Sequence, residues 1–391
     1  MNASQHLSGT TPVSVPLLDV VGGNAPLRDE ILAAIARVVD SGRFLHGPDC
    51  RQLEAEVARR CEVPRAVSCA SGSDALLLAM MAFGIGPGDE VIVPSFTFFA
   101  TASCVWRVGA QPVFVDIDPV TFNMDPEQVE ASITRATRAI IPVHLFGQCV
   151  AMDEINRIAQ QHDLYVVEDA AQSIGASYQG RPAGSWGHVG CFSFYPTKNL
   201  GGMGDGGMLT TRDEKLANRL ALYAAHGMEP RYYHQVVGIN SRLDSIQAAV
   251  LNVKLQQLDA WNQARARNAA RYDELFTAAT LDRQLVLPTT TRKQCHVWNQ
   301  YTIRVPDGQR DALRAYLAKA NIGSEIYYPV PLHLQECFEP LGYQVGSLPE
   351  TERAANEVLS LPIYPELTEA QQAAVVGQIG RYYTKRMRSA A

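Results

Sequence analysis

The sequence lacks the features that mark membrane, secreted and nucleic-acid-binding proteins. No apolar run approaches the roughly 20 residues needed to span a bilayer. The first sixteen residues have neither the charged start nor the apolar middle of a signal peptide. The formal net charge is −6, and the basic residues are scattered rather than gathered in a stripe. We therefore expect a cytoplasmic protein whose partners include neither a membrane nor a nucleic acid.

Cysteine spacing also excludes two common kinds of site. No two of the eight cysteines are spaced as a zinc knuckle or a redox pair requires. Several lie in apolar runs, as Cys69 and Cys191 do. They are typical of small, reduced core residues, and we expect no metal site.

Length and composition predict an ordinary globular protein of two domains. The chain has 391 residues, of which 47% are apolar and 19% charged. Residues 1–16 are polar and are expected to be loosely ordered. After about residue 280 the alternation of short apolar runs and helical stretches gives way to a mixture of strands and helices. We therefore predict a large domain over 17–260 and a smaller α+β domain over 261–391, with the long helical stretch between them.

Short apolar runs alternate with helical stretches through the larger part. This alternation predicts a mostly parallel sheet covered by helices on both faces, which is an α/β fold. The expected strands are 65–70, 89–98, 111–118, 138–147, 164–171, 190–196 and 206–211. The expected helices include 27–40, 73–84, 151–163, 212–228, 242–278, 309–320 and a last one after Thr368.

Three stretches carry residues suited to chemistry. Lys198 follows an apolar strand and precedes a glycine-dense run, where a lysine shielded from water gains nucleophilicity; the alternative is a plain loop lysine. Asp169 ends another strand, where it could pair with the pyridine nitrogen of a cofactor such as pyridoxal phosphate (PLP) or cap a turn. Ser71 to Ser73 open a helix, which suits a phosphate or simple capping.

Together these stretches resemble the DegT/DnrJ/EryC1/StrS family of PLP-dependent nucleotide-sugar aminotransferases. The resemblance runs from about Pro16 to Tyr382. It implies a type I aminotransferase fold and a homodimer whose active sites are shared between subunits. The motifs that carry it are SGSDAL, PSFTFFATA, VDIDP, IIPVHLFGQ, VVEDAAQSIGA, SFYPTKNLGGMGDGG, GINSRLDSIQAA and YYPVPLHLQ.

The resemblance assigns four residues to the PLP ring. Lys198 matches the lysine that binds PLP covalently, and Asp169 matches the partner of the pyridine nitrogen. Phe98 matches the aromatic residue that stacks on the ring, and Gln172 a residue packed near its hydroxyl. By pattern alone, Phe98 would be assigned to the core.

Other residues are assigned to the phosphate and the subunit interface. Gly72, Ser73 and Ser193 match phosphate contacts. Asn240 matches an asparagine that reaches the phosphate from the neighbouring subunit, and Arg242 lies near the same interface, where we count it as a candidate substrate contact.

The resemblance further implies an amino acid donor, which we expect to be glutamate, and a nucleotide-linked keto-sugar acceptor. Tyr327 and His333 are candidate substrate contacts, and the alternative is that they pack the small domain. The segment 226–251 is more similar to members that act on 3-keto sugars, including UDP-linked 3-oxo uronates, than to those that act at C4. Dehydratases of the family carry histidine at the position of Lys198, so the lysine in this sequence argues against a dehydratase. A regulatory protein that binds PLP or sugar without turnover is a further alternative.

Overall fold

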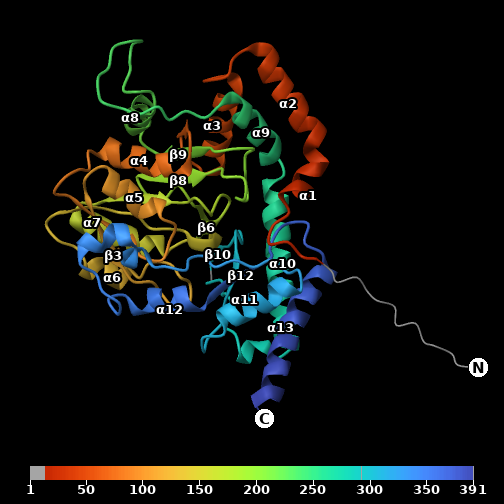
Figure 1. Cartoon of the computed structure of the whole chain (residues 1–391). Helices are drawn as coiled ribbons and strands as arrows, with labels where there is room; N and C mark the ends of the chain where they lie inside the picture. The colour runs from red at the N-terminus through yellow and green to blue at the C-terminus, as the bar shows by residue number, and fades with distance from the viewer. Residues whose placement is uncertain (1–13, 292, 391) are drawn as a thin grey trace, which may run out of the picture.

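The computed structural model describes residues 14–291 and 293–390, and a seven-stranded sheet lies at its centre (Figure 1). The strand order is β1-β9-β8-β5-β4-β2-β3. Strand β9 runs antiparallel to β1 and β8, and the other neighbouring pairs are parallel. The strands are β1 (Arg65–Cys69), β2 (Glu90–Pro94), β3 (Gln111–Val115), β4 (Thr137–Ile140), β5 (Tyr165–Asp169), β8 (Val189–Ser193) and β9 (Gly207–Thr211). Each overlaps a strand predicted from the sequence, which confirms the mostly parallel α/β fold.

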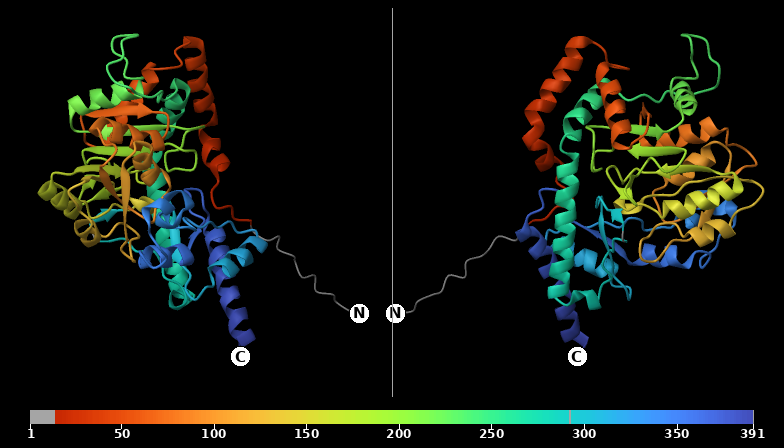
Figure 2. Two further views of the ribbon diagram at one scale, coloured as in Figure 1. Left: turned by 60° about the vertical axis from the view of Figure 1, so that its left-hand side comes forward. Right: turned by 180° about the vertical axis from the view of Figure 1, so that it is seen from behind.

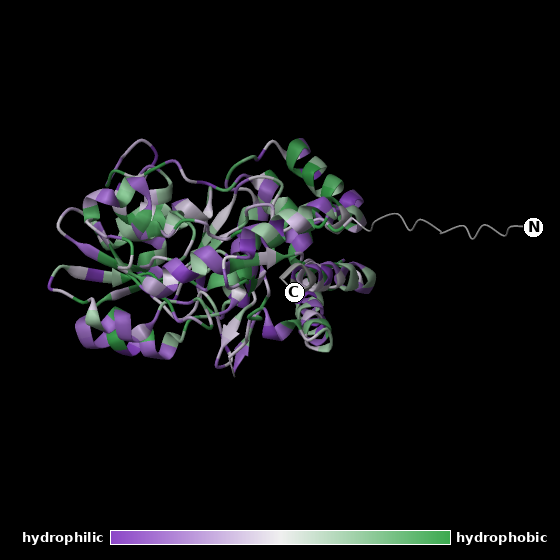
Figure 3. Ribbon diagram, turned by 60° about the horizontal axis from the view of Figure 1, so that its bottom comes forward, coloured by the Kyte–Doolittle hydropathy of each residue, from purple (hydrophilic) through white to green (hydrophobic). Residues whose placement is uncertain are grey.

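Helices cover both faces of the sheet because successive side chains of a strand point to opposite sides. Val91 and Val93 pack with one set of helices, whereas Ile92 between them packs on the other face. The first set comprises α4 (Gly72–Phe83), α5 (Ala100–Arg107) and α8 (Glu214–Ala224). The second face carries α3 (Pro48–Arg60), α6 (Pro126–Ala131), α7 (Met152–His162) and α9 (Ser245–Leu255). In Figure 3 the outer helices carry both purple and green bands, as expected of helices with one buried side.

The C-terminal third builds a second core around a two-stranded antiparallel sheet. Helix α10 (Leu258–Ala278) runs into this core, where Tyr272 and Phe276 are fully buried (Figure 1). The other elements of this part are β10 (Gln294–Cys295), β11 (Tyr301–Arg304), α11 (Arg310–Lys319), α12 (Pro349–Glu357), β12 (Val358–Leu361) and α13 (Glu369–Ala390).

The remaining elements are short or lie at the edge. They are α1 (Val20–Asn24), α2 (Arg28–Ser41), β6 (Ser177–Tyr178), β7 (Arg181–Pro182) and the 3-10 helices η1 (Ala25–Leu27), η2 (Leu145–Gly147), η3 (Leu281–Arg283), η4 (Leu332–Leu334) and η5 (Glu336–Leu341).

Two predicted helices need correction. The single helix expected over 242–278 is two helices, because α9 ends at Leu255 and α10 begins at Leu258. Neither glycine nor proline marks this break in the sequence. The helix expected over 212–228 is shorter, because Asp213 caps its start and the chain leaves the helix after Ala224.

The chain then forms a projecting arm, residues 226–240. Backbone bridges join Met228 to His234 and Ala225 to Asn240, so the arm folds back on itself. It stands out from the body at the same end as α2 (Figure 2). Such projections bury little of their surface within one chain.

Three further predictions concern the N-terminal segment, the cysteines and membrane-spanning helices. The N-terminal segment falls mostly outside the described residues, although Val15 is buried and pairs with Ile322. All eight cysteines are free, but Cys295 and Cys337 are exposed, so the prediction of core residues was wrong for these two. Within the described ranges no helix combines the length and apolarity needed to cross a membrane.

Candidate active site

The ends of β5 and β8 and the start of α4 meet at one edge of the sheet. Asp169 is the last residue of β5 and Ser193 the last of β8, while Gly72 opens α4. A Cβ atom on Gly72 would lie 2.7 Å from the Cβ of Ser193, so only glycine allows this approach without a shift. Ligands of open α/β sheets bind at this edge.

Lys198 lies five residues beyond β8 and is half-buried. Its backbone N–H donates to the carbonyl of Tyr195 (2.9 Å), which closes a turn at the end of the strand. Burial lowers the pKa of its amine from 10.5 to about 8, and the charge of Asp169 opposes that change. A sizeable share of the amine is therefore unprotonated near neutral pH and is available as a nucleophile.

Asp169 is 5% exposed, and two donors hold its carboxylate. The Thr101 hydroxyl donates to Oδ2 (2.7 Å), and the Ala171 N–H donates to Oδ1 (3.2 Å). Burial raises the pKa of Asp169, whereas these two hydrogen bonds and the positive charge of Lys198 lower it. A buried carboxylate of this kind is stabilised by a cationic partner.

Glu168, next to Asp169, is fully buried, and as its neighbour along β5 it points to the opposite face of the strand. Its carboxylate accepts the N–H groups of Gly184 (2.8 Å), Trp186 (2.7 Å) and Gly187 (2.7 Å), as well as His144 Nε2 (2.9 Å). Four donors satisfy an ionised carboxylate.

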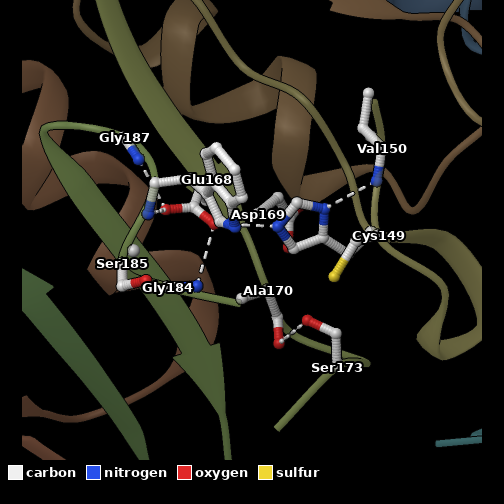
Figure 4. Close-up of polar contacts among 12 residues, drawn as sticks. Cys149, Val150, Glu168, Asp169, Ala170, Ser173, Gly184, Ser185 and Gly187 are labelled. Carbon is white, nitrogen blue, oxygen red and sulfur yellow. Dashed lines mark hydrogen bonds and ion pairs between the residues drawn. The ribbon is translucent and has the colours of Figure 1, made fainter. Parts of the chain in front are cut away.

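His144 connects this network to Asp169. Its Nδ1 accepts the N–H of Val150 (3.2 Å), so Nε2 carries the ring proton that is donated to Glu168 (Figure 4). The backbone N–H of His144 donates to the carbonyl of Asp169 (3.0 Å). The pair therefore clamps the end of β5, from which Asp169 projects.

Two aromatic side chains and one amide form a connected group near the end of β5. Phe98 is 57% exposed, so the structure does not place it in the core. Its ring lies 6.1 Å from that of Tyr328, centroid to centroid. Gln172 accepts the N–H of Phe146 (2.6 Å) and donates to the Tyr328 hydroxyl (3.2 Å).

These features fit PLP. The α4 start offers backbone N–H groups for a phosphate, and Ser71 caps only that of Asp74 (3.1 Å). Lys198 would hold the aldehyde carbon, Asp169 the ring nitrogen, and Gly72, Ser73 and Ser193 the phosphate. Within the described part of the chain, no group of three His, Cys, Asp or Glu side chains is placed to hold a metal.

Asn240 and Arg242 lie where the arm returns to the body. Asn240 is exposed, and Arg242 is half-buried with an Nε that has no hydrogen-bond partner. Between them, the Ser241 hydroxyl donates to Asp74 (2.7 Å) and so ties this segment to the start of α4. The reach of Asn240 into a second subunit stays a prediction.

The candidate substrate residues differ in their surroundings. The His333 side chain is fully buried, with Nδ1 on Ser95 Oγ (2.7 Å) and Nε2 on Glu352 (3.2 Å). This is the packing role that the sequence left as an alternative. Tyr327 is half-buried against Tyr328.

Sequence reasoning gave no role to Thr101, His144, Glu168 or Tyr328. An acidic residue within an apolar strand was the available signal for Glu168, because a buried charge needs partners. Its partners come from distant segments, so the sequence could not name them.

Comparisons with known proteins identify the family of the chain. The model of the DegT/DnrJ/EryC1/StrS aminotransferase family matches residues 26–380. The chain is 50% identical to a pleiotropic regulatory protein of Geobacillus stearothermophilus, with 95% of this chain and 99% of that protein covered. It is 47% identical to UDP-N-acetyl-3-dehydro-alpha-D-glucosamine 3-aminotransferase of Acidithiobacillus ferrooxidans, with the same coverage.

A solved structure extends the likeness to the fold. DesV of S. venezuelae in complex with a ketimine intermediate superimposes with a TM-score of 0.91 at 45% identity, covering 95% of this chain and 99% of that one. The chain therefore belongs to the DegT/DnrJ/EryC1/StrS family and is a PLP-dependent sugar aminotransferase with the type I fold.

Proposed function

We propose that the chain transfers an amino group from glutamate to C3 of a nucleotide-linked 3-keto sugar, such as a UDP-3-oxo sugar or uronate. The observation that carries the proposal is the half-buried Lys198, whose amine has a pKa of about 8 and interacts by charge with the buried carboxylate of Asp169. The name of the Acidithiobacillus ferrooxidans relative supports amination at C3.

Bound PLP supplies the electron sink that makes the donor's α-hydrogen acidic. The free Lys198 amine would accept that proton and return it to the C4′ carbon of PLP, and the reverse transfer would serve the second half of the reaction. Asp169 favours the protonated ring nitrogen through its charge. Phe98 limits the movement of the ring, and Gln172 is oriented by Phe146 and Tyr328.

We also propose a homodimer in which Asn240 completes the partner subunit's phosphate site. The surface around Lys198 exposes large apolar side chains, with Tyr195 at 52% and Met203 at 46%. On the arm, Tyr232 is 73% and Val237 90% exposed. Exposed apolar surface of this extent is typical of protein interfaces.

Subunit mixing tests the shared site. Lys198→Ala and Asn240→Ala are each expected to be inactive as homodimers. Mixed and refolded together, they should regain activity, because a heterodimer combines the Lys198 of one subunit with the Asn240 of the other. Activity that stays absent in verified heterodimers contradicts the shared site.

Turnover tests the reaction. The PLP-loaded protein is mixed with glutamate, and 2-oxoglutarate is measured with and without a UDP-3-oxo sugar. The proposal expects one equivalent of 2-oxoglutarate without sugar and continuous formation with it, together with a product aminated at C3 by NMR. The same assay is run with a 4-keto nucleotide-sugar. Continuous formation of 2-oxoglutarate with that sugar alone favours the C4 alternative.

The name of the Geobacillus stearothermophilus relative favours a second candidate, a regulatory protein that binds PLP or sugar. Such a protein would bind PLP through Lys198 but release no 2-oxoglutarate. The single-equivalent experiment therefore separates the two.

A further inference from the structure

A row of three buried polar side chains ends at Asp169. Thr101 is fully buried, Thr97 is 2% exposed and Asp169 is 5% exposed. Thr97 Oγ1 lies 3.2 Å from Thr101 Oγ1, which in turn lies 2.7 Å from Asp169 Oδ2. None of the three faces solvent, so the polarity of this row has to be satisfied internally.

The direction of the hydrogen bonds follows from the chemistry of the groups. An ionised carboxylate only accepts, so the Thr101 hydroxyl gives its single proton to Asp169. Thr101 Oγ1 can then only accept, and Thr97 must donate to it. The row therefore points its donors one way, toward the carboxylate.

The same turn also presents the ring-stacking residue. The Thr101 N–H donates to the carbonyl of Phe98 (3.2 Å), at the start of α5. The Phe98 side chain is exposed, whereas Thr101 is fully buried and contacts Asp169. One turn thus sets both the aromatic face and the orientation of the carboxylate.

We propose that Thr101 is a positioning residue that keeps Asp169 ionised and oriented toward the ring nitrogen of bound PLP, with Thr97 supporting it. The inference rests on the proposed role of Asp169. Valine has nearly the volume of threonine, so packing alone does not explain a hydroxyl here, and a buried hydroxyl without a purpose is costly.

The consequence concerns the proton on the ring nitrogen. Burial raises the pKa of Asp169, and the Thr101 hydrogen bond is the largest of the opposing effects. Without this donor the carboxylate is more easily protonated. A neutral Asp169 no longer favours the protonated ring nitrogen, and PLP becomes a weaker electron sink.

The test uses Thr101→Val, which removes the hydroxyl at constant shape, and Thr101→Ser, which restores it. Thr97→Val removes only the outer donor. Each protein is loaded with PLP carrying 15N in the ring, and the 15N chemical shift is followed from pH 6 to 9. Thermal melts of the apoproteins check folding, and Thr101→Ala replaces Thr101→Val if the latter does not fold.

We expect the 15N shift of Thr101→Val to move toward that of an unprotonated ring nitrogen across pH 6 to 9, because the proton shared with Asp169 moves toward the more basic carboxylate. Thr97→Val should lie between this shift and that of wild type, and Thr101→Ser should match wild type. The rate of the half-reaction with glutamate should fall about tenfold, while the dissociation constant of PLP changes little.

An unchanged 15N titration in Thr101→Val overturns the inference. Asp169→Asn identifies which idea failed. If Asp169→Asn deprotonates the ring nitrogen and Thr101→Val does not, the role of Thr101 is wrong and that of Asp169 stands. If Asp169→Asn leaves the nitrogen protonated as well, the role proposed for Asp169 is wrong.

Discussion

The pH dependence of PLP capture offers a direct test of the environment of Lys198. Only an unprotonated amine attacks the PLP aldehyde. With a pKa of about 8, roughly one quarter of the Lys198 amine is unprotonated at pH 7.5. An ordinary lysine with a pKa of about 10.4 has about one part in a thousand unprotonated. The reactive fraction is thus roughly 200-fold larger.

The assay mixes apoprotein with excess PLP and records the rate of covalent attachment from pH 6 to 10. The rate should rise with pH and level off above about pH 8. Nα-acetyl-lysine, measured alongside, corrects for the ionisation of PLP itself and should not level off in this range. A protein rate that rises in parallel with the free amine through pH 9.5 refutes the reasoning.

Asp169→Asn tests the direction in which Asp169 shifts the pKa of Lys198. The charge of Asp169 raises the pKa of Lys198, so its removal should move the midpoint of the profile to lower pH. Turnover with glutamate should nevertheless be lost. The exposed Asp163→Asn is the matched control and should leave the midpoint unchanged.

Three further predictions concern groups around the site and in the core. Gly72→Ala places a Cβ 2.7 Å from that of Ser193, so PLP affinity by fluorescence titration should fall about tenfold, whereas Gly86→Ala, with only one atom within 4 Å, should not change it. Glu168→Gln should lower the free energy of unfolding in urea by about 3 kcal/mol, because its amide group faces donors; a loss below about 1 kcal/mol would show that the clamp matters little. His296 is buried and its pKa is lowered to about 3, so the unfolded chain binds its proton more readily and the free energy of unfolding should fall as pH drops below about 6.5, by up to about 1.4 kcal/mol per unit. In His296→Gln the free energy of unfolding should fall less steeply with falling pH, by the contribution of one proton. Equal slopes in both proteins would contradict the lowered pKa of His296.

Much of the sheet was predictable because its strands are buried on both faces. Continuous apolar runs such as 89–98 and 164–171 leave a local signal, and each overlaps an observed strand. The break between α9 and α10 left none, because propensity is continuous through 256–257. Helix 212–228 was overextended because the arm, which begins at 226, carries no proline before Pro230.

The residues of the site likewise fall into those that the sequence predicts and those that it does not. Lys198 and Asp169 were recognisable in the sequence, since Asp169 ends an apolar strand, Lys198 follows another, and each lies in a motif that the family shares. Strand order then brings the two together, because β5 and β8 are parallel neighbours and their carboxyl ends meet at one edge.

Only the tertiary structure decided what surrounds these two residues. Thr101 meets Asp169 across 68 positions of sequence, and His333 meets Ser95 across 238. Hydrogen bonds at such separations leave no periodicity, so the sequence could neither find the donor of Asp169 nor show that His333 is enclosed. Local patterns indicate where in the chain the strands lie, whereas burial and polar partners depend on segments that only folding brings into contact.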